Sequence, residues 1–198
     1  MTDIAIRRVT RPGVISLLLT AALTTALHAE LNLSPQRQEF DLEGVTMEQL
    51  VFDTGAAQKA SYQPPVGWLY HGKGDRLDLQ PPGKSRAQAA VIRTTMKQPL
   101  GFEQENRKKF AEAVVQSLPP DSENVKIEAE ENNPLKIDGH ETYLIHVSYT
   151  YSRERFSRLW ILLNRSDEQL RFQLTCADRD YTELARSFQK SLYSWRHL

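Results

Sequence analysis

Tyrosines and arginines gather in one predicted hairpin, the segment of this chain best suited to bind a ligand. Its members are Tyr149, Tyr151, Arg153, Arg155 and Arg158, with Trp160 on the returning strand. Arginine makes forked hydrogen bonds to carboxylate and phosphate groups, and tyrosine adds a flat face and a hydroxyl group. We therefore predict an exposed binding surface here for a carboxylate, phosphate or glycan. The alternative is an ordinary solvated hairpin whose arginines pair with Glu154 and its neighbours.

The pair His140-Glu141, with His146 further along, matches part of a zinc-protease motif, but the spacing of the two histidines does not fit that motif. The helical motif needs its second histidine four residues after His140, and position 144 is Leu. If both lie on a strand, His140 and His146 are about 20 Å apart, at roughly 3.3 Å per residue. We predict no metal site and no cofactor.

The single cysteine, Cys176, excludes an internal disulfide and is the one candidate thiol nucleophile. It follows Phe172 and Leu174 at intervals of two, which places all three on one apolar face of a strand. Burial disfavours the thiolate that a nucleophile needs, so we interpret Cys176 as structural. The chain has no catalytic signature, and we predict a non-catalytic binding or accessory protein. The alternative is a hydrolase-type enzyme whose site is assembled only in the fold.

The first 29 residues have the order of an export signal. Arg7, Arg8 and Arg11 form a basic start, residues 14–27 carry no charge, and Ala29 offers a small residue for cleavage. The uncharged run is shorter than the roughly 20 residues that span a bilayer. We therefore expect a periplasmic or secreted protein of the cell envelope.

The charge of the remaining chain limits its partners. Without residues 1–29 it keeps 22 basic and 24 acidic residues, a net charge of −2. A nearly neutral domain has no general attraction to nucleic acid or to an anionic membrane surface. No later segment is apolar enough to cross a membrane. We expect the partner to be another envelope protein or a small anionic ligand.

Periodicity and turn residues predict the order of the elements. After a loose lead-in at residues 30–37, we expect one or two strands between 40 and 53, and strands at 68–70, 77–79 and 87–96. A helix at 102–118 precedes four strands, at 125–129, 143–151, 156–163 and 170–175. A last helix runs from about Asp180 to Ser194, with Asp180 and Glu183 as a capping box and Trp195 on its apolar stripe. This order predicts an α+β fold with helices packed on an antiparallel sheet.

Three short motifs resemble the PsbP-like superfamily, which also includes a Ran-binding nuclear import factor and envelope proteins of the DcrB type. They are Pro65-Val-Gly67-Trp68, Ile137-Asp-Gly139, and Leu170-Arg-Phe-Gln-Leu-Thr-Cys176. The resemblance implies an α/β/α sandwich around an antiparallel sheet, in a superfamily of mostly accessory or binding proteins. It carries over no functional residue, because these are turn and core positions. Together with the export signal (1–29), it divides the chain into that signal, an extension with one or two strands (30–60) and a PsbP-like domain (61–198).

We predict that export removes the N-terminal segment. Mass spectrometry of the protein from the envelope fraction should give a first residue between about Leu27 and Leu31, because the small residues for cleavage lie there. A cytoplasmic protein that keeps Met1 would contradict this prediction.

Overall fold

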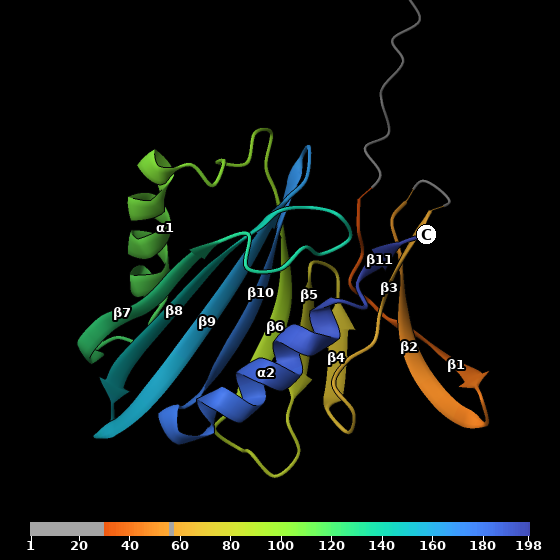
Figure 1. The fold of residues 1–198 in the computed structure, drawn as a ribbon, viewed down its shortest axis with the longest axis horizontal. Coiled ribbons are helices and arrows are strands. Elements are labelled where there is room, and N and C mark those ends of the chain that lie inside the picture. The colour runs from red at the N-terminus through yellow and green to blue at the C-terminus, as the bar shows by residue number, and fades with distance from the viewer. Residues whose placement is uncertain (1–29, 56–57) are drawn as a thin grey trace, which may run out of the picture.

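The computed structural model describes residues 30–55 and 58–198, so the predicted signal lies outside the described residues (Figure 1). The strands are β1 (Gln36–Leu42), β2 (Val45–Asp53), β3 (Lys59–Tyr62), β4 (Leu69–Lys73), β5 (Arg76–Gln80), β6 (Gln88–Thr95), β7 (Glu123–Asn132), β8 (Thr142–Tyr151), β9 (Glu154–Asn164), β10 (Glu168–Ala177) and β11 (Arg196–His197). The helices are α1 (Gln104–Gln116) and α2 (Tyr181–Leu192), and a 3-10 turn, η1 (Asp178–Asp180), precedes α2. This content of antiparallel strands and two helices confirms the predicted α+β class.

A seven-stranded antiparallel sheet forms the centre of the domain, in the order β4-β5-β6-β10-β9-β8-β7. The last four strands form the predicted meander, and β6 pairs with the other edge of β10. Ser152 and Arg153, both with positive φ, make the tight turn between β8 and β9. This sheet brings residues 88–95 next to residues 168–177.

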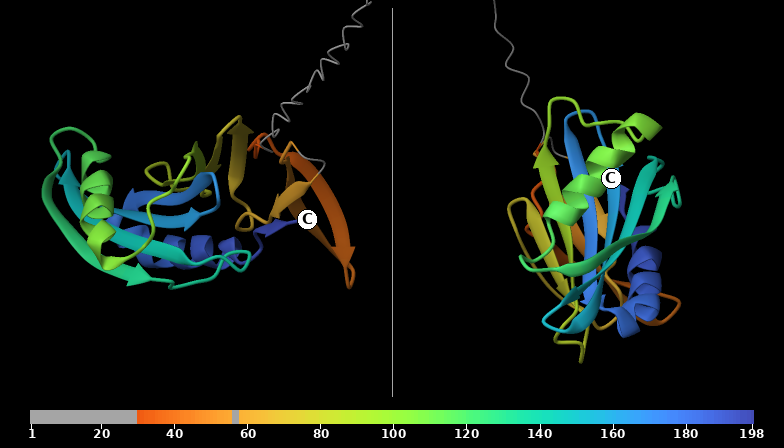
Figure 2. Two further views of the ribbon diagram at one scale, coloured as in Figure 1. Left: turned by 90° about the horizontal axis from the view of Figure 1, so that it is seen from above. Right: turned by 90° about the vertical axis from the view of Figure 1, so that its left-hand side faces the viewer.

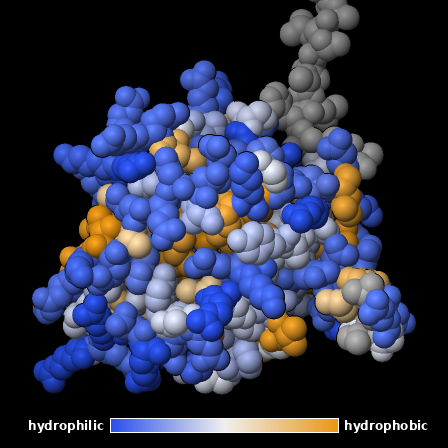
Figure 3. All heavy atoms as spheres, viewed as in Figure 1, coloured by the Kyte–Doolittle hydropathy of each residue, from blue (hydrophilic) through white to orange (hydrophobic). Residues whose placement is uncertain are grey.

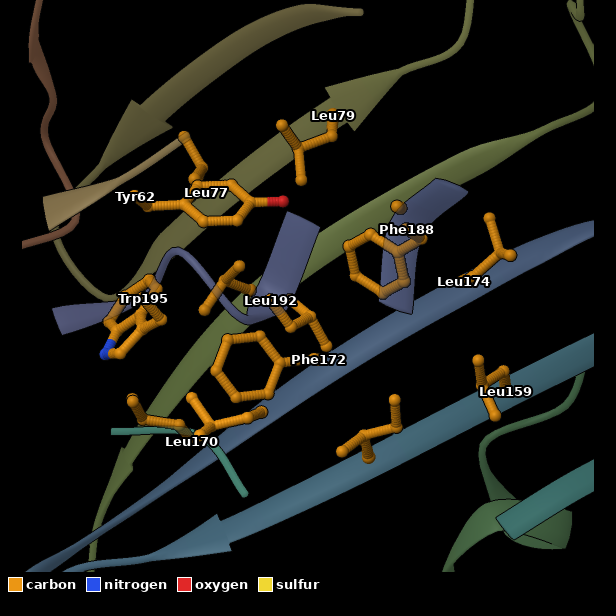
Figure 4. Close-up of a cluster of buried hydrophobic side chains, with 14 of the residues drawn as sticks. Tyr62, Leu77, Leu79, Leu159, Leu170, Phe172, Leu174, Phe188, Leu192 and Trp195 are labelled. Carbon is orange, nitrogen blue, oxygen red and sulfur yellow. The ribbon is translucent and has the colours of Figure 1, made fainter. Parts of the chain in front are cut away.

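Alternation in these strands divides the apolar side chains between two cores. On one face, Leu159, Phe172 and Leu174 pack with Phe188 and Leu192 of α2 (Figure 4). The other core joins α1 to β8 and β9, and its residues are Phe110, Val114, Leu118, Tyr143, Ile145, Val147, Tyr149, Trp160 and Leu162. The two helices therefore lie on opposite faces of the sheet (Figure 2). Because α2 turns its apolar stripe toward the sheet, the side of the molecule on which α2 lies is covered mostly by hydrophilic side chains (Figure 3).

A second sheet, in the order β1-β2-β3-β11, packs at one end of the first. Where one or two strands were expected, β1 and β2 form a hairpin that turns at Glu43-Gly44, both with positive φ. The strands β3 and β11 were not predicted. Trp195, expected on the stripe of the last helix, instead follows α2 and is fully buried. Its ring lies 5.7 Å from that of Phe52 and 5.5 Å from that of Phe172, between the two sheets (Figure 4).

The segment before β1 is anchored, which corrects the expectation of a loose lead-in. Leu31 and Leu33 are buried in the main core. The Asn32 amide donates to the Asp53 carbonyl, and the Leu33 amide donates to the Gly74 carbonyl. The segment therefore connects β2 of the small sheet with the β4–β5 turn of the large one.

The region before residue 61 shares its core with the rest of the chain. The expected boundary between residues 60 and 61 falls within β3, and Leu50 and Phe52 belong to the cluster that contains Phe172. The small sheet therefore draws on both ends of the described chain.

The expected capping box at the start of α2 is wrong. Asp180 has helical dihedral angles and makes no side-chain cap, because η1 already continues the turn. Its carboxylate instead accepts a hydrogen bond from the Lys84 ammonium at 2.7 Å. The helix start is thus held to the β5–β6 loop rather than capped locally.

Neither helix in the described part of the chain is long and apolar enough to cross a membrane.

We predict that Gly72→Ala lowers the free energy of unfolding by about 1–3 kcal/mol, as overpacking does. A Cβ atom at Gly72 would lie 2.1 Å from the Leu33 carbonyl oxygen and 2.7 Å from the Pro35 ring. Gly72 does not have a positive φ, so the expected destabilisation comes from steric overlap and not from backbone strain. Urea denaturation should show the loss, while exposed Lys73→Ala serves as the control with a change below about 0.5 kcal/mol. Equal midpoints for the two variants would mean that the lead-in does not pack on β4.

Candidate functional site

The structure does not gather the five predicted binding residues on one exposed surface. Tyr149 is 2 % exposed and Arg158 is 8 % exposed, because both face α1. Tyr151 and Arg153 are exposed at the tip of the hairpin, and Arg155 points to the opposite face of the sheet from Arg158. This corrects the expectation that all five side chains are exposed, since alternation along β8 and β9 turns neighbouring side chains to opposite faces.

Arg158 has a structural task at the C-terminal end of α1. Its guanidinium donates to the Ser117 carbonyl at 2.5 Å and to the Ser117 hydroxyl at 2.9 Å, and its Nε donates to Thr175. The last turn of α1 has no basic residue of its own. A cation at this end of a helix satisfies carbonyl groups and complements the helix dipole. Arg158 therefore fastens α1 to the sheet.

Arg155 lies in a polar cluster on the α2 side of the sheet. It pairs with Glu128 at 2.9 Å and with Asp178 at 3.1 Å. Ser148 also donates to Glu128, and the Lys126 and Ser148 hydrogen bonds lower the pKa of Glu128 to about 2. The ion pairs of Arg155 thus agree with the alternative of an ordinary solvated hairpin, although its acidic partners are Glu128 and Asp178 rather than Glu154.

The same cluster brings together a serine, a histidine and an aspartate, the residue types of a hydrolase. His146 Nε2 lies 3.1 Å from Ser157 Oγ, and Ser157 donates to Asp178 at 2.6 Å. A serine hydroxyl has one proton, so His146 must be the donor to Ser157 and cannot accept its proton. In a hydrolase the acid orients the histidine instead. Ser157 is also fully buried, which closes it to a substrate.

The surroundings of Cys176, His140 and His146, the other candidates from the sequence, do not form a reactive site. Cys176 is fully buried, and burial raises the pKa of its thiol to about 12, with Asp180 and Asp178 adding to the effect. His140 is exposed, whereas the His146 ring stacks on Tyr181 at 3.8 Å. Within residues 30–55 and 58–198, no three histidine, cysteine, aspartate or glutamate side chains form a group that could hold a metal ion.

A groove lies beside α1, where this helix no longer covers the large sheet. We call it the α1 groove. Its volume is about 710 Å³, within the range of small-molecule sites. The α1 groove is bordered by α1, by the segment after β6, and by β9 and β10. Its apolar lining residues are Met96, Leu100, Phe110, Ala113, Trp160 and Leu162.

Arg171 is the polar group that distinguishes the α1 groove. Its guanidinium lies over the Trp160 ring, 4.3 Å from the centroid, and Trp160 is held by a hydrogen bond to Gln173. The Nε atom of Arg171 is buried without a hydrogen-bond partner among the described residues, and no described carboxylate pairs with the side chain. Burial, followed by the charges of Arg158 and Arg76, lowers the pKa of Arg171. The site thus holds a guanidinium with unused donors.

Sequence reasoning did not predict Arg171 as a site residue. It stands between Leu170 and Phe172, and a charged residue at that spacing is typical of the solvent side of a strand. Only the fold shows that α1 borders this side of β10. No local signal in residues 170–176 could have identified it.

Comparison with known proteins supports the fold. No protein-family model and no curated protein matches this chain. Cyanobacterial PsbP (CyanoP) from Synechocystis sp. PCC 6803 is similar in structure, with a TM-score of 0.53, 14% identity, and coverage of 86% of this chain and 94% of that chain. PA94, a protein of unknown function from Pseudomonas aeruginosa, has a TM-score of 0.49 and 13% identity, over 80% of this chain and 95% of that one. The likeness to CyanoP confirms a PsbP-like fold.

We predict that Arg158→Ala destabilises the protein by about 2 kcal/mol, because a buried charged donor to α1 is lost. Arg153→Ala, at the exposed hairpin tip, is the matched control and should change stability by less than about 0.5 kcal/mol. Urea denaturation of both variants provides the measurement. Equal stability of the two variants would show that Arg158 does not hold α1.

Proposed function

We propose that this protein is an exported, non-catalytic binding or accessory protein of the cell envelope, and that the α1 groove is its binding site. The observation that carries the proposal is the Arg171 guanidinium, which lies in a groove of small-molecule size with no acidic partner in the described chain. The basic and apolar order of residues 1–29 supports export.

The arrangement of the helices supports the α/β/α sandwich that the PsbP-like resemblance implies. In it α2 covers the core on one face, while α1 covers β8 and β9 and leaves the groove beside it. At 14% identity, the likeness to CyanoP supports this architecture and no shared partner.

Catalysis by the cluster of His146, Ser157 and Asp178 is the alternative. Proximity favours it, but the buried serine donates to the aspartate, which is the wrong direction for activation by histidine. Binding needs no such activation. The α1 groove is therefore the better candidate.

Native mass spectrometry of protein isolated from the envelope fraction tests the proposal. We predict that the wild type retains a small molecule and that Ala113→Trp loses it, because an indole at this exposed helix position fills the groove. Glu112→Trp, on the same helix but outside the groove lining, is the control and should retain the molecule.

Two results would contradict the proposal. Retention of the same molecule by Ala113→Trp would place binding elsewhere. Ester hydrolysis by the wild type that disappears in Ser157→Ala would favour the enzyme alternative.

A further inference from the structure

The chemistry of the α1 groove narrows the ligand class, and this inference rests on the proposed function. Arg171 stands in one row of the large sheet with Arg76, Ile92, Leu162 and Tyr143, according to the strand register. Tyr143 lies beneath α1, where Phe110 packs on it at 5.4 Å. Arg171 therefore sits at the border between the covered, apolar half of this face and its open, polar half.

The charge around Arg171 is not balanced by the described chain. Arg76 on the same row is paired with Asp78, and Arg158 is used by Ser117 and Thr175. The groove lining contains two basic residues, Lys109 and Arg171, and no aspartate or glutamate. A partly buried cation without a counter-charge is unfavourable, and an anion that enters beside it removes this penalty.

The form of the donor group favours a carboxylate. A guanidinium offers a planar fork of N–H groups, which matches the two oxygens of a carboxylate. The cation–π contact with the Trp160 ring holds the guanidinium in place. Lys109 keeps its charge but already donates a hydrogen bond to the neutral Asn106 amide, so Arg171 is the lining cation that makes no hydrogen bond among the described residues. One unused guanidinium fork matches one carboxylate group.

The rest of the groove favours an apolar body. Phe110 and Leu162 are buried side chains of the α1 core, and Met96 and Leu100 continue the apolar lining beyond them. A ligand anchored at Arg171 can lay a hydrocarbon chain along these residues. Each methylene group that leaves water strengthens binding by about fourfold.

From these observations we infer that the α1 groove binds an amphipathic carboxylate, a single carboxylate group on an aliphatic chain, with Arg171 as its anchor. The carboxylate oxygens accept hydrogen bonds from the Arg171 fork. The aliphatic chain packs between α1 and the segment that follows β6.

Calorimetric titration with decanoate tests the ligand class on protein that native mass spectrometry shows to be free of bound molecules. Decanoate should bind, whereas acetate, which lacks the chain, and decanol, which lacks the charge, should bind at least about tenfold more weakly. Arg171→Gln should weaken decanoate binding at least about tenfold and leave decanol binding unchanged. Arg179→Gln, an exposed arginine outside the groove, should bind decanoate as the wild type does.

A second variant separates the effect of the positive charge from the effect of the forked donor geometry. Arg171→Lys keeps the charge but not the fork, so its affinity for decanoate should lie between those of the wild type and Arg171→Gln. Unchanged decanoate affinity in Arg171→Gln, or in Ala113→Trp, would overturn the inference. Absence of decanoate binding to the wild type would overturn it as well. If a co-purified molecule were still lost from Ala113→Trp in that case, the binding function would stand and only the ligand class would be wrong.

Discussion

Burial of Trp195 is the contact on which the joining of the two sheets depends. Its ring touches Phe52 of β2, Tyr62 of β3 and Phe172 of β10, so that one side chain bridges both sheets. Polar contacts close the same region, since Ser191 meets the Tyr62 hydroxyl and His197 meets Asp138. Burial of a large aromatic side chain contributes more than any one of these hydrogen bonds. Without Trp195 the small sheet would lose the aromatic side chain that packs between its strands and β10.

The α1 groove follows from a mismatch between one short helix and a wide sheet. A seven-stranded sheet offers more surface than the 13 residues of α1 can cover. On the α2 side the small sheet and the lead-in fill the remaining space. On the α1 side no described segment beyond α1 covers the sheet in this way, and β10 presents Arg171 there, next to Trp160. The asymmetry of the two faces is thus the origin of the candidate site.

The sequence could predict the large sheet because its strands carry their signal locally. Alternation in residues 143–151 and 170–175 is strong, and the turn before the first of them has positive φ at Asp138 and Gly139, residue types that tolerate it. The short strands β3 and β11 have only four and two residues, too few for any period, and they form because of tertiary pairing. The buried positions of Tyr149 and Arg158 were missed for a related reason. A tyrosine or arginine on a strand is read as exposed unless the position of a covering helix is known. Arg171 is the opposite case. Its place between Leu170 and Phe172 correctly predicted that it faces away from the main core, but it could not show that α1 borders that face.

The contact between Phe52 and Trp195 also bears on when the domain can fold. These two residues are 143 positions apart, so β2 and β3 are synthesised long before the side chain that covers them. Contacts at such a separation form slowly, because a long loop must close before they contribute. The early strands therefore lack one of the side chains that complete their core until the end of the chain has been synthesised. The joint between the two sheets is thus among the last parts of the domain that can be completed.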